Sequence, residues 1–68
     1  MSELKITLKA ARVNAGFTVR EAAKKLNVSP STIIAWEKNP EKINALYQSK
    51  ISDAYDVDVD NIIFLPQN

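Results

Sequence analysis

The side chains best suited to chemistry in this sequence are three aspartates, Asp56, Asp58 and Asp60, at alternating positions near the C-terminus. Alternating aspartates open the calcium-binding loop of an EF-hand, but that loop also needs glycine at its sixth position and glutamate at its twelfth. Asn61 and Gln67 stand at those positions here. Helix capping and solvation explain the aspartates better, and we therefore expect no metal site.

Catalysis finds no support in the composition. The chain contains no histidine, no cysteine and a single glycine. It therefore lacks the commonest general base, a thiolate nucleophile or metal ligand, and a glycine-rich phosphate loop. We expect a protein that is not an enzyme and that uses no cofactor.

The distribution of charge suggests a partner. Residues 1–50 hold all nine basic residues and four acidic ones, a net charge of +5, whereas residues 51–68 hold four aspartates and no base, a net charge of −4. A chain charged in this way can turn a basic face toward a polyanion. Nucleic acid is therefore one candidate partner.

Length and composition indicate a single small domain covering residues 1–68. The chain is 46% hydrophobic and 25% charged, as in an ordinary globular protein. At this size only about 60% of the unfolded chain's surface is buried on folding, so stability is expected to be marginal. No apolar run approaches the roughly 18 residues of a membrane span, and we expect a cytoplasmic protein.

The apolar pattern predicts a first helix near the N-terminus. Apolar residues recur at helical spacing at Leu4, Leu8, Ala11 and Ala15. Ser2 is a suitable N-cap, and Gly16 can end the helix because glycine adopts the left-handed conformation without steric cost.

Two further helices are predicted on either side of Asn27. Thr18 and Glu21 match a capping box at the start of a helix that runs to about Leu26. Asn27 suits a left-handed turn. Ser29-Pro30 then supplies an N-cap and a first helical proline, so the next helix should run from Pro30 to about Lys38 and stop at Asn39-Pro40.

The remaining sequence predicts two more helices after a loop at 40–42. The fourth follows from apolar residues at helical spacing, which are Ile43, Leu46, Tyr47, Ile51, Ala54 and Tyr55. Asp58 can cap a short fifth helix from Val59 to Phe64. The fold class expected is therefore all-α, with five short helices and no strand.

The second and third predicted helices have the composition of a helix-turn-helix unit, about residues 18–38. A connection of about three residues separates them, and Ala23 is small enough to allow close approach at a steep crossing angle. We expect four apolar side chains to fill the wedge between them: Leu26, Val28, Ile33 and Trp36.

The motifs together resemble the Cro/C1-type (Xre) helix-turn-helix family of phage and bacterial regulators. The resemblance extends over about residues 4–64 and rests on Leu8-Lys-Ala-Ala-Arg12, Gly16-Phe-Thr18, Glu21-Ala-Ala23, Leu26-Asn-Val-Ser29, Ser31-Thr-Ile33, Trp36-Glu37 and Val57-Asp-Val-Asp60. It implies a compact five-helix, lambda-repressor-like domain with a short C-terminal helix and tail at 58–68. It also implies a transcriptional regulator, a Cro-like protein or small repressor, whose third helix lies in the major groove of operator DNA.

The resemblance and helical geometry together divide the third helix into two faces. Ile33, Trp36 and Glu37 share one face, which we expect to be held in the fold. The residues expected to face the bases are Ser29, Pro30, Ser31, Ile34, Ala35 and Lys38. Ile34 and Ala35 have the apolar character that suits contact with a thymine methyl group.

Two positions depart from the family's usual pattern. Val19 and Pro30 stand where relatives often have glutamines that contact a phosphate and an adenine. Neither side chain has a hydrogen-bond donor. Sequence reading is therefore expected to rest on few side chains, with DNA shape and water-mediated contacts contributing.

The resemblance also implies contacts that support the reading helix. Residues expected to contact phosphate are Thr18, Arg20, Asn39, Lys42 and Asn44, together with Lys38. Arg12 and Glu37 are expected to form an ion pair that ties the first helix to the third, a structural role more than a DNA contact.

Specific binding by so short a helix is expected to require a homodimer on two half-sites, and such a dimer can be weak in solution. The apolar run near the C-terminus is the expected dimer surface, with Ile63, Phe64, Leu65 and Pro66 as its residues and Ile62 and Leu65 partly used by the core. An alternative function stays open: an antirepressor-like or antitoxin-like module that uses the same fold to bind a second regulatory protein. The +5 charge of residues 1–50 favours DNA, whereas the overall charge of +1 and the absent glutamines favour the alternative.

Overall fold

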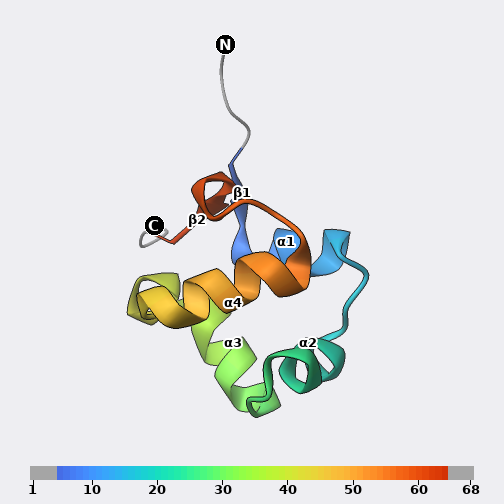
Figure 1. Cartoon of the computed structure of the whole chain (residues 1–68). Coiled ribbons are helices and arrows are strands. Elements are labelled where there is room, and N and C mark those ends of the chain that lie inside the picture. Colours follow the sequence, from blue (N-terminus) through green and yellow to red (C-terminus); the bar gives the residue numbers. More distant parts are fainter. Residues whose placement is uncertain (1–4, 65–68) are drawn as a thin grey trace.

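The computed structural model describes residues 5–64 as four α-helices with a pair of very short strands (Figure 1). The helices are α1 (Leu8–Asn14), α2 (Val19–Leu26), α3 (Pro30–Lys38) and α4 (Ala45–Tyr55). The other elements are β1 (Ile6–Thr7), the 3-10 turns η1 (Pro40–Lys42) and η2 (Val59–Asn61), and β2 (Ile62–Ile63). The expected all-α class is confirmed, with four α-helices among the described residues instead of five.

Every α-helix begins at a side chain that accepts a hydrogen bond from the first turn. Thr18 and Glu21 form the predicted capping box of α2, in which each side chain accepts from the other's backbone N–H. Ser29 caps α3 ahead of Pro30, also as predicted. Thr7 and Asn44 cap α1 and α4. These caps matter because they satisfy backbone donors that an isolated short helix leaves unpaired.

The turns between helices use left-handed backbone at three positions. Gly16 has a φ of 86° and Asn27 a φ of 60°, which confirms the turns predicted at these residues. Asp56 ends α4 with a φ of 54°. Asparagine and aspartate are the side chains that tolerate this conformation best. The left-handed turn at Asn27 ends α2 and lets the chain change direction within a few residues, so that α3 packs against α2.

The N-terminal helix begins later than the sequence predicts. Thr7, not Ser2, is the N-cap of α1, and Ile6–Thr7 form β1. Ser2 and Leu4 lie outside the described residues. β1 pairs in parallel with β2, Ile6 opposite Ile62 and Thr7 opposite Ile63. A pairing between segments so distant in sequence has no local signal, which is why helical spacing dominated the prediction.

The predicted fifth helix is also wrong in extent. Asp58 does cap a turn, because its carboxylate accepts from the Asp60 amide, but that turn is the single 3-10 turn η2. The chain then extends as β2. β-branched isoleucines favour extended backbone, and the extended geometry allows Ile62 to be buried against the core while its backbone pairs with β1.

The hydrophobic core lies where the four helices meet. Its buried side chains are Leu8, Ala11, Ala22, Ala23, Leu26, Ile33, Ile43, Ile51, Tyr55 and Ile62. Ile33 and Ile51 are its largest fully buried members. Leu46, expected on the buried face of the fourth helix, is instead 61% exposed. It lies in the first turn of α4, and its helical phase does not point it at the core.

Substitutions on α4 should separate buried from exposed positions. Ile51→Ala is expected to lower the free energy of unfolding by about 2–5 kcal/mol, because it leaves a cavity at a fully buried site. Leu46→Ala on the same helix is expected to change it by less than about 0.5 kcal/mol. Urea unfolding followed by circular dichroism measures both. Equal losses in the two variants would contradict this assignment of the core.

Candidate nucleic-acid interface

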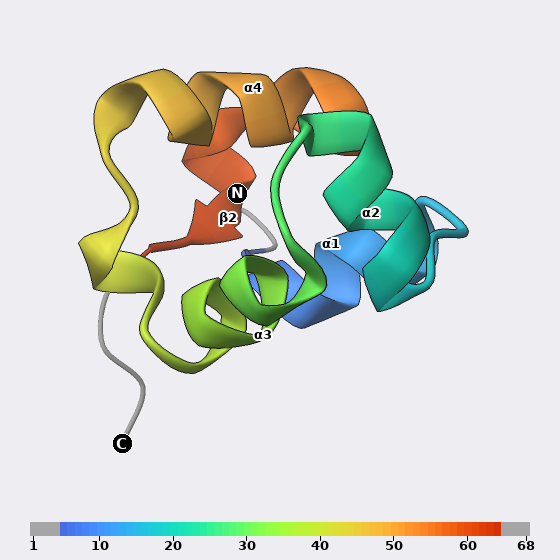
Figure 2. The ribbon, with the colours of Figure 1, turned by 90° about the horizontal axis from the view of Figure 1, so that it is seen from below.

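The α2–turn–α3 unit is packed through small and branched apolar side chains. Ala22 and Ala23 of α2 are 0% and 2% exposed, which allows the two helices to approach closely. Leu26 and Ile33 are buried between them. Val28, in the turn, is half-buried against this cluster. Figure 2 shows α3 beside α1 and joined to α2 by the short turn, so one side of α3 is covered by two helices.

Helix α3 has one covered and one open face. Ile33 is 1% exposed, whereas its neighbour Ile34 is 50% exposed. Trp36 and Glu37 are half-buried on the covered side. The structure places all six residues predicted to face bases at exposed positions: Ser29, Pro30, Ser31, Ile34, Ala35 and Lys38.

Few polar side chains on α3 remain available for a ligand. The Ser29 hydroxyl accepts from the Thr32 amide at 3.2 Å and shares a hydrogen bond with the Thr32 hydroxyl at 2.9 Å. Glu37 is engaged with Arg12. Ser31 and Lys38 are then the exposed polar side chains of α3 that make no side-chain hydrogen bond within the described residues. The open face is consequently more apolar than charged.

An ion pair between Arg12 and Glu37 joins α1 to α3, as the sequence led us to expect. Arg12 Nε donates to Glu37 Oε2 at 2.6 Å, and the two side chains are 8% and 12% exposed. Arg12 also donates from Nη1 to the carbonyl oxygen of Phe17 at 2.9 Å. The hydrogen bond to Glu37 raises the pKa of Arg12 against the opposing effect of burial. The guanidinium therefore links α1, the α1–α2 connection and α3.

Tyr55 of α4 lies in the same electrostatic environment. Its side chain is buried, and burial, followed by the negative charge of Glu37, raises its pKa to about 12. Tyr55 is therefore neutral at physiological pH. Its ring also packs against Phe17 with ring centroids 6.1 Å apart, which adds an apolar contact beside the ion pair.

The residues predicted to contact phosphate are all exposed, but they differ in what they offer. The side chains of Thr18 and Asn44 already accept hydrogen bonds from the Glu21 and Tyr47 amides as helix caps. What these helix starts offer an anion is the backbone N–H groups of the first two residues, which have no partner within a helix. Arg20, Asn39 and Lys42 offer exposed side chains instead.

An aromatic contact that the sequence reasoning missed supports the end of α3. The rings of Trp36 in α3 and Tyr47 in α4 lie 5.1 Å apart between centroids. The Lys50 ammonium lies 5.3 Å from the centroid of the Tyr47 ring, a cation–π contact. Tyr47 was expected only as an apolar residue of the fourth helix. Its partner belongs to another helix, so helical spacing contains no signal for the pair.

The predicted dimer surface is only partly within the described residues. Ile62 is buried, as expected. Ile63 and Phe64 are half-buried, and Phe64 packs against the core. Leu65 and Pro66 lie outside the described residues. Ile63 and Phe64 thus keep part of their apolar surface accessible.

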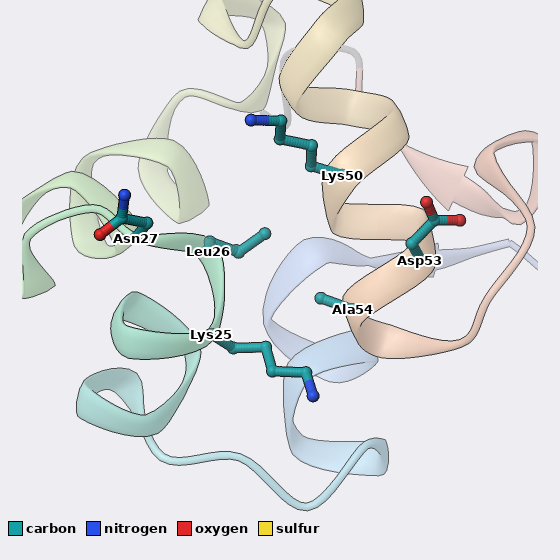
Figure 3. Close-up of a pocket in the computed structure, with 6 residues that line it drawn as sticks. All are labelled: Lys25, Leu26, Asn27, Lys50, Asp53 and Ala54. Atoms are coloured by element: carbon teal, nitrogen blue, oxygen red, sulfur yellow. The ribbon is translucent and has the colours of Figure 1, made fainter.

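A shallow cleft of about 360 Å³ lies between the end of α2 and the middle of α4 (Figure 3). Its lining residues are Lys25, Leu26, Asn27, Lys50, Asp53 and Ala54. Two ammonium groups and one carboxylate border it, and it contains none of the residues predicted to meet DNA. Ligand pockets are mostly apolar, and this cleft has only Leu26 and Ala54 as apolar lining.

The acidic C-terminal segment is spatially separate from α3. Asp58, the N-cap of η2, and Asp60 within η2 are both exposed. Figure 1 shows η2 and the strands on one side of α4 and the α2–α3 unit on the other. These two of the four C-terminal aspartates therefore lie away from α3, whereas Asp53 borders the cleft beside the end of α2.

Comparison with protein families supplies the deciding observation. The sequence profile described as helix-turn-helix, that of the Cro/C1-type proteins, matches residues 8–62. The chain belongs to the Cro/C1-type helix-turn-helix family. As a member, it is a DNA-binding regulator in the general sense, from a family that is regulatory and typically not enzymatic. Comparisons with curated proteins and with solved structures gave no significant match.

None of the four α-helices of this family member within residues 5–64 is long and apolar enough to cross a bilayer.

Removing one partner of the ion pair should destabilise this helix-turn-helix domain strongly. Arg12→Ala is expected to cost about 3–5 kcal/mol, because Glu37 is left charged and nearly buried. The double variant Arg12→Met, Glu37→Leu should recover most of that loss, since it removes both charges. Thermal and urea unfolding of the wild type and of both variants measures these differences in the free energy of unfolding. An Arg12→Ala variant as stable as the wild type would show that the pair contributes nothing.

Proposed function

We propose that this protein is a sequence-specific regulator of transcription that binds double-stranded operator DNA with α3 in the major groove. The observation that carries the proposal is the division of α3. Its covered face is held by Ile33 and by the Arg12–Glu37 pair, while its other face is exposed along its length. A helix fixed on one side and open on the other is what groove insertion requires.

In this proposal the open face of α3 meets the base edges, and the neighbouring helix starts hold the backbone. The base-facing residues are Ser29, Pro30, Ser31, Ile34, Ala35 and Lys38. Phosphate contacts come from Arg20, Asn39 and Lys42 side chains and from the amides that follow Thr18 and Asn44. Such contacts set the position of the helix in the groove but carry no sequence information themselves.

The proposed mode of action is that of a Cro-like protein or small repressor, which occupies an operator in the cytoplasm as a homodimer. One α3 helix reaches few base pairs, so two copies on half-sites about 34–36 Å apart supply the needed specificity. The half-buried Ile63 and Phe64 support a dimer surface at the C-terminal end. The acidic η2 lies on the side of α4 away from α3, where it does not oppose the DNA backbone.

One observation favours the second candidate, a module that binds another regulatory protein. The centre of the open face of α3 is apolar, with Ile34 half exposed next to exposed Ala35. An apolar helix face also suits a groove on a protein partner. The two functions differ in their dependence on salt, because release of counterions from DNA has no equivalent at an apolar protein interface.

Salt titration should distinguish the candidates. Binding of the full chain to duplex DNA is expected to weaken with a slope of several units in log K against log salt concentration, and Lys42→Ala should reduce that slope by about one. Lys9→Ala, an exposed lysine on α1, is the matched control and should leave the slope unchanged. Fluorescence anisotropy measures both. No affinity for any duplex at low salt would refute the DNA proposal.

Sedimentation equilibrium should test the homodimer. The wild type is expected to associate to a dimer, at least when bound to a selected duplex. Ile63→Lys should shift it toward monomer, because a charge replaces half-buried apolar surface at the proposed contact. Val13→Lys is the control at a 56% exposed position on α1 and should leave the dimer intact, with circular dichroism verifying both folds. A monomer both free and on DNA would refute the dimer.

A further inference from the structure

The chemistry of the open face of α3 narrows the kind of base that it can read. Ser31, Ile34, Ala35 and Lys38 follow one another at spacings of three, one and three residues, so they form one stripe along the helix. The two polar residues are at its ends and the two apolar residues at its centre. In a helix-turn-helix protein the N-terminal part of the recognition helix contacts the base edges. Ile34 and Ala35 follow this first turn of α3 on the same open face, so their apolar side chains restrict which base edges fit against them.

The major groove offers an apolar pair one favourable partner. Base edges there present nitrogen and oxygen donors and acceptors, and the 5-methyl group of thymine is the apolar group that projects furthest into the groove. Packed over a cytosine amino group or a guanine oxygen, Ile34 would remove water from a polar atom without replacing its hydrogen bond, which is costly. Packed over a methyl group, it buries apolar surface on both sides.

The structure also fixes the direction in which α3 displays Ile34. Helix α3 is held on its covered side by Ile33, which is 1% exposed, and by the nearly buried Arg12–Glu37 pair. A β-branched side chain on a helix has one strongly preferred rotamer. Ser29 and Thr32 bond to each other and Pro30 has no donor, so the hydrogen-bonding side chains left on the open face are Ser31 and Lys38, at the two ends of the stripe.

We infer that Ile34 and Ala35 read DNA by packing against pyrimidine 5-methyl groups, so that the preferred site carries thymine, with 5-methylcytosine as its nearest substitute. The inference rests on the proposed function and specifies its substrate. It makes binding depend on a methyl group and not on the hydrogen-bonding pattern of the pair that bears it. Cytosine and 5-methylcytosine differ only by this group, so methylation of a cytosine at the contacted position strengthens binding.

The test is a comparison of four bases at each pyrimidine of a duplex that the full chain selects from random DNA. Synthetic duplexes carry thymine, uracil, 5-methylcytosine or cytosine at one position, paired with adenine or guanine as appropriate. Removing the methyl group is expected to weaken binding about three- to fivefold per contacted position, in both the adenine-paired and the guanine-paired series. Ile34→Ser should reduce that ratio toward one, whereas Val13→Ala, at an exposed position on α1, should preserve it.

The outcomes separate this inference from the proposed function. Selection of no duplex at all would refute the proposed function itself. Selection of a duplex on which uracil binds as well as thymine at every position would refute the methyl contact and leave the DNA-binding function standing. A methyl effect that is unchanged in Ile34→Ser would refute the role of Ile34. Methyl sensitivity in both series, lost in Ile34→Ser and kept in Val13→Ala, would support the inference.

Discussion

The orientation of α3 in the domain depends on the ion pair between Arg12 and Glu37. One guanidinium bonds to a carboxylate on α3 and to the Phe17 carbonyl oxygen in the α1–α2 connection, so three segments meet at a single side chain. Both charges are almost entirely removed from solvent. A nearly buried charge without its partner is costly, so any arrangement of α3 that separates the two is disfavoured. The pair therefore favours the one orientation of α3 in which the two side chains meet.

Only a few side chains of α3 hold this helix against the rest of the domain. α3 has nine residues, and three of them (Ile33, Trp36 and Glu37) attach it to the core, to α4 and to α1. A short helix is unstable alone, because few of its backbone groups are paired internally. Caps at all four helix starts and tight left-handed turns compensate for the short lengths. The other face of α3 is therefore not needed to hold the helix in the fold.

Features that depend on neighbouring residues were predictable from the sequence. The capping box at Thr18, the left-handed Asn27 and the Ser29-Pro30 start are each specified by residue types within a few positions of one another. The exposed and buried faces of α3 followed from helical period together with the family resemblance, so the exposure of Ile34 beside buried Ile33 was expected. The Arg12–Glu37 pair came from family resemblance, because no local rule connects residues so far apart in sequence.

Three features required the tertiary structure, because each depends on how separate segments pack. The segments predicted to begin the first helix and to end the fifth helix instead pair as β1 and β2. Backbone hydrogen bonds between strands so distant in sequence leave no periodic pattern of apolar residues, so the sequence did not predict this pairing. The contact between Trp36 and Tyr47 joins two helices, so the spacing within either helix contains no signal for it. Leu46 is exposed because its position around α4 points it away from the core, although Tyr47 in the same turn packs against the core. By itself, the sequence determined where α2 and α3 begin and end and which face of α3 is buried, because these depend on local spacing. Only the tertiary structure decided how the ends of the chain join and which polar groups of α3 remain available to a ligand, because these depend on packing between segments.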